Sequence, residues 1–264
     1  MKRDNMKGKV IIITGASSGI GRATAVSLAK EGCILVLAAR RTEELYNTLQ
    51  LVKENGGTGI TVPTDVRDEN DVRQMIEKTI QQFERLDVLI NNAGFGKFAM
   101  LSDTELQDFE EMMNVNYMGT VRCTKHALPY LLKQRSGHII NVASIAGKVG
   151  TAKSTGYSAT KHAVLGFTSS LRQELSGTGI HVSAVNPGPI DTPFFSISDP
   201  EGTYKNRIKP FLIKPEAVAK KIVRLIKFPK REVNIPVPMA IGAILYQLAP
   251  GFFEKIAGNI INKK

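Results

Sequence analysis

The sequence predicts a single doubly wound α/β domain, in which helices cover both faces of a central parallel sheet of about seven strands. Short apolar runs such as Val10 to Ile13 are of the kind that parallel strands bury on both faces. Such runs alternate six times with helical patterns. No internal repeat, low-complexity segment or change of composition divides the 264 residues, a length that suits one domain of ordinary size.

The first strand, residues 9–14, leads directly into a glycine-rich turn that opens a helix over residues 22–31. Glycines let the backbone turn tightly and approach a pyrophosphate, whose charge the amide groups and dipole of the new helix stabilise. A turn without a ligand is the alternative, but its place between a strand and a helix favours nucleotide binding by a Rossmann-type domain. The expected contacts are Gly15, Ser17, Ser18, Gly19, Ile20 and Gly21.

The second strand, residues 33–39, ends at Arg40 and Arg41. In a Rossmann-type domain an acidic residue near this point accepts hydrogen bonds from the ribose of NAD, whereas arginine accommodates the 2′-phosphate of NADP. Because no Asp or Glu stands between residues 33 and 42, NADP(H) is the favoured cofactor. The alternative is that the arginines only begin a solvated helix over residues 42–54.

The remaining strands place polar residues at their carboxyl ends, the edge at which open α/β sheets bind ligands. Strands are expected over residues 59–63, 86–91, 137–144, 179–186 and 232–236, and helices over residues 69–83, 108–134 and 157–176. The fourth strand runs into the turn Asn91-Asn92-Ala93-Gly94, and Ser144 ends the fifth. Asn116 lies in the helix between them, and Asp68 is positioned to cap the helix that begins at residue 69.

Tyr157 and Lys161 stand four residues apart at the start of the helix over residues 157–176. Positions i and i+4 share one face of a helix, so the phenol and the ammonium can point into one cavity. A nearby ammonium lowers the pKa of a phenol, which is ordinarily about 10. Tyr157 is therefore a candidate general acid/base toward a carbonyl or alcohol oxygen. The pair alone is a weak signal, because a tyrosine on an amphipathic helix often finds a lysine at this spacing by chance.

The composition is that of a soluble globular protein, with 42% apolar and 22% charged residues and a net charge of +11. Basic residues spread over solvated helix faces are the preferred account of this charge, and we expect no nucleic acid partner because no basic motif is interleaved with aromatic residues. Cys33 and Cys123 stand far apart, as in a reducing compartment, and the four histidines lack the spacing of a metal site. No signal peptide precedes the first strand, so we expect a cytoplasmic protein.

Taken in order along the chain, these residues resemble the motifs of the short-chain dehydrogenase/reductase family over about residues 7–235. The resemblance rests on Thr14-Gly15-x-x-x-Gly19-x-Gly21, Asp65, Asn91-Asn92-Ala93-Gly94, Asn116, Ser144, Tyr157-x-x-x-Lys161 and Pro187-Gly188. It implies transfer of a hydride between NADP(H) and a carbonyl or secondary alcohol, with Asn116, Ser144, Tyr157 and Lys161 as catalytic residues. Tyr157 would donate the proton and Ser144 would hold the substrate oxygen. Lys161 would lower the Tyr157 pKa and bind the nicotinamide ribose, and Asn116 would anchor a water that relays protons.

The same resemblance extends the cofactor site. It implies that Ser17 and Arg40 bind the 2′-phosphate, that Asp65 contacts the adenine ring and that Thr192 contacts the carboxamide of nicotinamide. Further cofactor contacts are expected at Arg41, Val66, Asn92, Ala93, Gly94, Tyr157, Lys161, Pro187, Gly188 and Ile190.

Residues 192–215 lie where this family places its substrate lid, within an NADP-binding domain that we expect to span residues 1–236. The lid carries Phe194, Phe195 and Phe211, although aromatic residues in a loop can equally fix the fold of the loop itself. This lining suits an apolar ketone or aldehyde of medium to large size. The expected substrate contacts are Phe95, Phe98, Ser144, Ala146, Val149, Ser154, Tyr157, Phe194 and Phe195.

A further segment, residues 237–264, carries apolar residues at helical spacing, at Ile241, Ile244, Leu245 and Leu248. Its apolar runs are shorter than the roughly 20 residues needed to cross a bilayer. We expect it to pack on the domain or on a second subunit of a homo-oligomer, a dimer or a tetramer. The alternative is contact with a membrane surface. This segment resembles the C-termini of retinol- and steroid-type members of the family.

Three alternatives to a carbonyl reductase or alcohol dehydrogenase remain. A 3-oxoacyl-[acyl-carrier-protein] reductase would receive an acidic partner protein on basic residues such as Lys133, Arg135 and Arg172, but the C-terminal segment argues against it. A non-catalytic NADP-binding redox sensor would have no need of a placed proton donor. A membrane-peripheral scaffold would be held by the tail.

Overall fold

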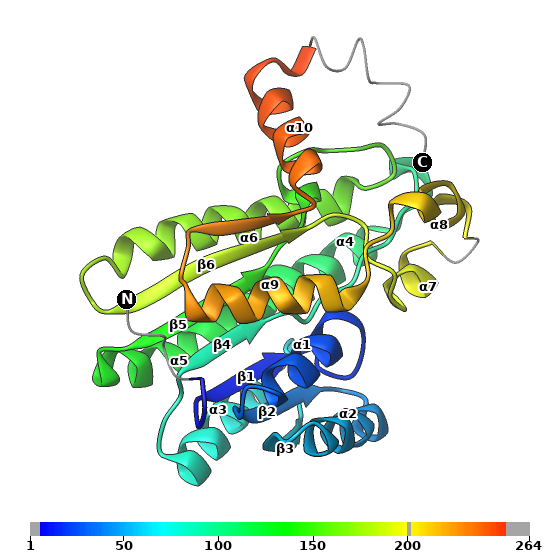
Figure 1. Cartoon of the computed structure of the whole chain (residues 1–264). Coiled ribbons are helices and arrows are strands. Elements are labelled where there is room, and N and C mark those ends of the chain that lie inside the picture. Colours follow the sequence, from blue (N-terminus) through cyan, green and yellow to red (C-terminus); the bar gives the residue numbers. More distant parts are fainter. Residues whose placement is uncertain (1–5, 200–201, 252–264) are drawn as a thin grey trace.

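The computed structural model in Figure 1 describes residues 6–199 and 202–251. Within these residues, seven parallel strands form one sheet in the order β3-β2-β1-β4-β5-β6-β7. The predicted doubly wound fold is confirmed. The strands are β1 (Val10–Thr14), β2 (Ile34–Ala39), β3 (Thr58–Pro63), β4 (Val88–Asn91), β5 (Gly137–Val142), β6 (Ile180–Pro187) and β7 (Glu232–Ile235).

The central strand β1 is apolar along its whole length because both faces of the sheet are covered. Ile11 and Ile13 pack into one hydrophobic core, and Ile12, which points the other way, packs into the second. All three side chains are fully buried. The unbroken apolar run therefore serves two cores rather than one.

Helices cover both faces of the sheet (Figure 1). On one face, the core contains residues of α1 (Gly19–Ala29), α2 (Thr42–Glu54) and α9 (Pro215–Lys227). On the other, it contains residues of α3 (Glu69–Phe83), α5 (Gly119–Gln134) and α6 (Thr155–Glu174). As expected, the carboxylate of Asp68 caps α3 by accepting hydrogen bonds from the backbone amides of Asn70 and Asp71. Helix α9 is not among the helices that the sequence predicts.

The order of the strands reverses between β1 and β4, since the chain winds outward to β3 and then returns to the other side of β1. At such a switch point the connections leave the carboxyl ends of neighbouring strands in opposite directions, which opens a crevice there. The turns after β1, β2, β4, β5 and β6 all meet along this edge. This is where the sequence places its candidate residues.

The helix expected over residues 108–134 is interrupted. It consists of α4 (Leu106–Met113), a π-helical turn (Asn114–Met118) and α5. A π-helical turn inserts an extra residue into the helix and changes the direction of its side chains, and such turns are frequent at functional sites. This turn carries Asn116.

Above the crevice lie the lid and the last described helix. The lid contains α7 (Phe194–Ser198), α8 (Thr203–Ile208) and a 3-10 turn (Lys209–Phe211), and α10 (Val237–Leu248) follows β7. None of the helices in the described ranges is long and apolar enough to cross a membrane. Residues 252–264, which belong to the predicted C-terminal segment, lie outside the described residues.

Candidate active site

A cavity of about 1550 Å³ opens at the carboxyl edge of the sheet. Its floor comes from the turns after the strands, and its upper wall comes from the lid and α10. All of the predicted cofactor contacts except Gly21 line it, and so do Phe95, Phe98, Ser144, Ala146, Val149, Phe194 and Phe195. One cavity therefore holds both the nucleotide half and the substrate half of the predicted site.

The glycine-rich turn between β1 and α1 has the close packing that a pyrophosphate cradle needs. Gly15 has a φ of +66°, and a Cβ atom there would lie 2.9 Å from Cα of Ala93. Gly21 lies behind the cavity, where a Cβ would meet the carbonyl oxygen of Gly15 at 2.3 Å. Ser18 makes no side-chain capping hydrogen bond to α1, and no acidic residue stands in the first turn of this helix. The start of α1 therefore fits an anionic ligand.

Thr14 and Asn92 fix the turn in place. The Thr14 hydroxyl accepts hydrogen bonds from the backbone amides of Asn92 and Ala93, each at 3.0 Å. The side-chain amide of Asn92 donates to the carbonyl oxygen of Thr14 at 2.9 Å. Asn92, expected to contact the nucleotide, thus also ties the end of β4 to the end of β1.

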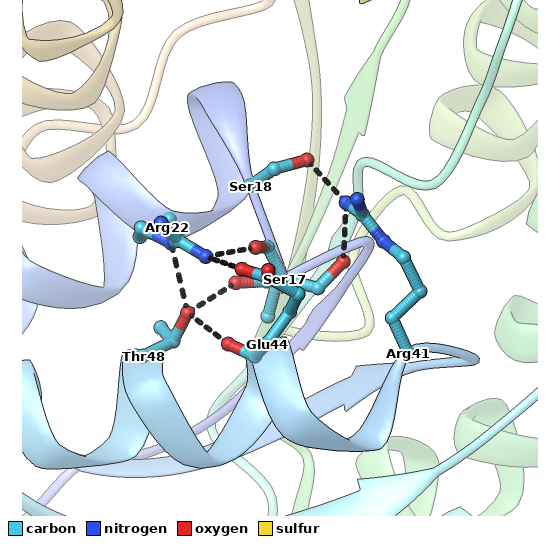
Figure 2. Close-up of polar contacts among 7 residues, drawn as sticks. Ser17, Ser18, Arg22, Arg41, Glu44 and Thr48 are labelled. Atoms are coloured by element: carbon cyan, nitrogen blue, oxygen red, sulfur yellow. Dashed lines mark hydrogen bonds and ion pairs between the residues drawn. The ribbon is translucent and has the colours of Figure 1, made fainter. Parts of the chain in front are cut away.

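Arg41 reaches over the turn to both serines (Figure 2). Its Nη2 atom donates to Oγ of Ser17 at 3.1 Å and to Oγ of Ser18 at 2.9 Å. Arg40 lines the cavity as well, but the cluster of one guanidinium and two hydroxyls is built by Arg41. Three adjacent donors of this kind fit a phosphate group.

A second arginine supports the same turn on the side away from Arg41 (Figure 2). Arg22 donates to the carbonyl oxygen of Ser17 at 2.6 Å and to the hydroxyl of Thr48 at 3.1 Å, and it pairs with Glu44. Thr48 in turn donates to the carbonyl oxygen of Ala16 at 3.1 Å. The position of Ser17 is therefore set by contacts from α1 and α2.

Asp65 and Val66 line the cavity after β3, as expected for the adenine end of a dinucleotide. The carboxylate of Asp65 is bound by the guanidinium of Arg67, with 2.7 Å between Nη2 and Oδ2. Partial burial of Asp65 acts to raise its pKa, but the hydrogen bonds and charge of Arg67 outweigh it and hold the pKa below its usual range. Asp65 is thus an ionised acceptor at neutral pH.

Tyr157 and Lys161 project from the first turns of α6 into the middle of the cavity. Nζ of Lys161 lies 5.7 Å from the centre of the Tyr157 ring and donates to the carbonyl oxygen of Val142 at 2.9 Å. Ser144 stands at the end of the connection from β5, where its hydroxyl accepts from the amide of Ala146 and donates to the carbonyl oxygen of Pro187. A phenol, a hydroxyl and an ammonium thus line one cavity.

Lys161 carries its charge inside the protein. Burial lowers its pKa from the ordinary 10.5 to about 8, and no charged group in the described part of the chain offsets this. The ammonium still predominates at neutral pH, because the pKa remains above 7. This places a positive charge 5.7 Å from the centre of the Tyr157 ring.

Asn116 lies behind this group and does not line the cavity. Its side-chain amide donates to the carbonyl oxygen of Phe95 at 2.8 Å and to the hydroxyl of Thr160 at 3.0 Å, and its oxygen accepts from the amide of Phe95 at 2.9 Å. These bonds connect the π-helical turn to α6 and to the loop after β4. Asn116 is therefore a positioning residue in this structure.

Comparison with known proteins identifies the family. A family model for short chain dehydrogenases matches residues 9–201. The chain belongs to the short-chain dehydrogenase family. An uncharacterized oxidoreductase of Staphylococcus aureus is 37% identical over 227 residues, which are 86% of this chain and 94% of the relative. The 3-oxoacyl-[acyl-carrier-protein] reductase of Thermotoga maritima is 40% identical over 191 residues, which are 71% of this chain and 76% of the relative.

A solved structure is also similar to this short-chain dehydrogenase over nearly its whole length. It is a short-chain dehydrogenase/reductase from Burkholderia phymatum in complex with NAD, with a TM-score of 0.87 and 25% identity. The likeness covers 94% of this chain and 96% of that one.

The substrate half of this short-chain dehydrogenase is apolar. Phe98 packs edge-to-face and Phe194 packs at a tilt against the Tyr157 ring, with 5.8 Å and 5.5 Å between ring centres. The cavity lining also includes the other apolar residues of the predicted set, Phe95, Ala146, Val149 and Phe195. Ser154 is the exception. It is fully buried and does not line the cavity, because its hydroxyl donates to the carbonyl oxygen of Thr151 at 2.7 Å and lies 3.1 Å from the Ser158 hydroxyl. The prediction for Ser154 is wrong.

The sequence analysis missed the contribution of α10. Met239, Gly242, Ala243 and Tyr246 line the cavity, together with Pro210 and other residues of the lid. The sequence of α10 showed only an apolar stripe at helical spacing, and that stripe lies on the opposite, exposed side of the helix. A second signal is Gly188, where a Cβ would lie 2.6 Å from the sulfur of Met239.

Proposed function

We propose that this protein is an NADPH-dependent oxidoreductase that interconverts a carbonyl and a secondary alcohol on a medium to large apolar substrate. The observation that carries the proposal is the placement of Tyr157, Ser144 and the buried ammonium of Lys161 between a phosphate-binding turn and an apolar pocket. A nucleotide site and a proton donor share one cavity. This arrangement suits a redox reaction at a carbonyl carbon.

Each residue of the site has a separate role in the proposed reaction. Tyr157 donates a proton to the carbonyl oxygen, and the charge of Lys161 makes that proton easier to give up. Ser144 accepts from the amide of Ala146, and its single hydroxyl proton, which here goes to the carbonyl oxygen of Pro187, would turn to the substrate oxygen and stabilise the negative charge that develops on it. Phe98 and Phe194 exclude water around the phenol. A bound nicotinamide cofactor supplies or accepts the hydride.

A preference for NADP(H) is supported by the charges at the end of β2. Arg40 and Arg41 line the cavity there, and Arg41 gathers Ser17 and Ser18 around one point. No carboxylate stands in β2 or directly after it to accept hydrogen bonds from a free ribose. The NAD in the Burkholderia structure belongs to that protein, and the arginines favour the phosphorylated cofactor here.

A 3-oxoacyl-[acyl-carrier-protein] reductase is the second candidate, supported by the Thermotoga relative. Helix α10 adds Met239 and Ala243 to the lining of the cavity, and this apolar lining favours a free apolar compound instead. The non-catalytic sensor is disfavoured by the complete set of Asn116, Ser144, Tyr157 and Lys161.

The test is a fluorescence titration with NADPH and NADH, followed by turnover on a panel of ketones, aldehydes and acyl thioesters. Arg41→Ala is expected to weaken NADPH binding by about 10–100-fold and NADH binding little, since it removes a charged phosphate contact. Arg73→Ala, on the exposed side of α3, is the control and should change neither.

Tyr157→Phe should remove turnover while NADPH binding persists. Retained activity in that variant would refute the proton-donor role. Equal losses for both cofactors in Arg41→Ala would refute the NADP preference, and turnover confined to acyl thioesters of the carrier protein would favour the second candidate.

A further inference from the structure

Helix α10 has two apolar faces with different surroundings. One lines the substrate cavity through Met239, Gly242, Ala243 and Tyr246. The other, which we call the outer face, leaves five large apolar side chains in solvent, and Ile241 is 54% and Leu248 77% exposed. The outer face consists of Val237, Ile241, Ile244, Leu245 and Leu248. A contiguous set of this kind on one short helix indicates a contact surface.

The lid adds to this surface at the other side of the cavity. Phe211 is 69% exposed at the end of the 3-10 turn, although it also borders the cavity that α10 lines. Lys209 and Lys214, on either side of Phe211 in the chain, are exposed. Lys205 is paired with Asp191 at 3.2 Å and contributes less. Bulky apolar side chains and cations therefore stand together around the cavity.

The C-terminal part of the chain, which includes the lid and α10, carries most of the net charge, although six of its basic residues belong to α9 and to the turn that follows it. Residues 202–264 contain 13 of the 35 Lys and Arg residues but only 3 of the 24 Asp and Glu residues, and so account for +10 of the net charge of +11. Residues 252–264, outside the described part, continue the same composition with Phe252, Phe253, Ile256, Ile260, Ile261 and three lysines. An excess of positive charge of this size at one end of the sequence indicates an anionic partner.

The exposed apolar outer face and the cations near it together favour one class of partner. A second copy of the chain would cover the outer face but would offer no anionic partner to Lys209 and Lys214. Nucleic acid would attract the cations but leave the outer face without an apolar partner. An anionic bilayer meets both requirements, because headgroups pair with the lysines while the apolar side chains of a helix lying on the surface insert between them. Figure 1 shows α10 standing out from the end of β7.

We propose that the outer face of α10 and the lid around Phe211 dock on an anionic lipid surface. Docking would bring the cavity on the opposite face of α10 next to the lipid, where apolar carbonyl compounds dissolve. This inference goes beyond the proposed function and does not depend on it, since lipid binding requires no turnover.

The test is flotation of the full-length protein with vesicles of phosphatidylcholine alone and of phosphatidylcholine with phosphatidylglycerol. We expect flotation with the anionic vesicles only, and less of it at high salt, which screens the lysines. The double variant Ile244→Asp/Leu248→Asp should lose at least about tenfold in vesicle affinity, because it places carboxylates in the inserting face. The double variant Lys209→Glu/Lys214→Glu should weaken binding through charge alone.

A matched control carries the same two carboxylates elsewhere. Tyr46→Asp/Leu51→Asp changes two exposed apolar residues of α2 and should bind vesicles as the unaltered protein does. Equal losses in both aspartate variants, equal binding to neutral and anionic vesicles, or no flotation at all would overturn the proposal. If the unaltered protein did not bind vesicles but self-associated, and Ile244→Asp/Leu248→Asp abolished that self-association, the outer face would be assigned to a second copy. If the protein bound only acidic acyl carrier protein, the face would be assigned to that protein.

Turnover of a water-soluble carbonyl compound is measured in the same preparations. Neither Ile244 nor Leu248 lines the cavity, so the variant is expected to keep this activity. Turnover without vesicle binding would refute only the docking, and vesicle binding without turnover would refute only the proposed function.

Discussion

Among the residues that line the cavity, Lys161 is a buried lysine whose charged form is destabilised by its burial. Its ammonium is enclosed by α6, β5 and the loop after β4, with the carbonyl oxygen of Val142 as its hydrogen-bond acceptor. The pKa lowered to about 8 means that the folded protein holds this proton less tightly than the unfolded chain does. A shift of this size, from 10.5, corresponds to about 3 kcal/mol of destabilisation by the charged form.

Lys161→Met is therefore expected to stabilise the protein without ligand while abolishing turnover. At pH 7 the free energy of unfolding should rise by about 1–3 kcal/mol, because an apolar side chain of similar length replaces a buried charge. Between about pH 8 and pH 10.5 the unfolded chain binds one more proton than the folded protein, so the stability of the unaltered protein rises with pH there. The stabilisation that Lys161→Met gives relative to the unaltered protein should therefore become smaller between about pH 8 and pH 10.5.

Urea denaturation as a function of pH measures this effect. Lys125→Met, which removes an exposed lysine of α5, is the control and should show no such pH dependence. Destabilisation by Lys161→Met at pH 7 would mean that the contacts of the ammonium outweigh the cost of burying it.

The residues that the sequence located best are those at the ends of parallel strands. Topology forces these ends to one edge, so Gly15, Asn92 and Ser144 could be placed together before their contacts were known. The choice between local partners could not be predicted. Ser154 turns its hydroxyl to Thr151 and Ser158 rather than to the cavity, and Arg41 rather than Arg40 reaches Ser17. Both outcomes depend on side-chain rotamers that no spacing encodes.

Among the helices, α10 sets the size of the substrate cavity through small residues. Gly242 lines the cavity, and a Cβ placed there would have no atom within 4 Å. A larger side chain at this position would project into the space that an extended apolar substrate needs.

Gly242→Leu is expected to lower kcat/KM for long-chain aldehydes by about 10–100-fold relative to short-chain ones, since each methylene that can no longer be buried costs about 0.8 kcal/mol. The helix should not be weakened, because leucine is a better helix former than glycine. Steady-state kinetics over a series of chain lengths measures the ratio.

Gly166→Leu is the matched control, a helical glycine of α6 that also has no atom within 4 Å of an added Cβ but does not line the cavity. It should leave the ratio unchanged. The same ratio in Gly242→Leu as in the unaltered protein would show that the substrate does not extend to α10.

The helical period predicted α10 but not its orientation. Spacing shows which residues share a face, and Ile241, Ile244 and Leu248 do, but it does not show which face the domain covers. The less apolar face, with Gly242 and Ala243, turned out to be the inner one. The π-helical turn at Asn116 was likewise beyond prediction, because it depends on the contacts of Asn116 with Phe95 and Thr160.

Across the whole molecule, the cavity joins parts of the chain that are far apart. Its lining begins at Gly15 and ends at Tyr246, so a cofactor bound there contacts turns after most of the strands. A ligand that binds only the folded protein stabilises it by an amount that grows with the logarithm of the ligand concentration above Kd.

We therefore expect NADPH to raise the thermal midpoint. At about 100 times its Kd it should stabilise the fold by about 2.7 kcal/mol, or a rise of roughly 5–10 °C in Tm for a domain of this size. Differential scanning fluorimetry measures the shift. At the same NADPH concentration Arg41→Ala should show a smaller rise, and Lys125→Met the full one. A rise unaffected by Arg41→Ala would place the cofactor's phosphate elsewhere.

The parallel sheet with helices on both faces could be predicted because an unbroken apolar strand requires cover on both faces. The order of its strands was not predicted. The strand pattern does not determine how many subunits assemble. A homo-oligomer, dimer or tetramer, stays a prediction, and light scattering of the purified protein would measure it.

The packing of Met239 against Gly188 has a consequence for how the protein is made. The nucleotide cradle is built from residues 15–94, which are translated early, whereas the wall of the substrate pocket comes from a segment that leaves the ribosome after the rest of the described structure. A chain that stops at Ile235 would contain the residues of the cradle and Tyr157 but would lack the side of the cavity that α10 lines. The chain segment that lines the substrate pocket is thus synthesised after the segment that forms the nucleotide cradle.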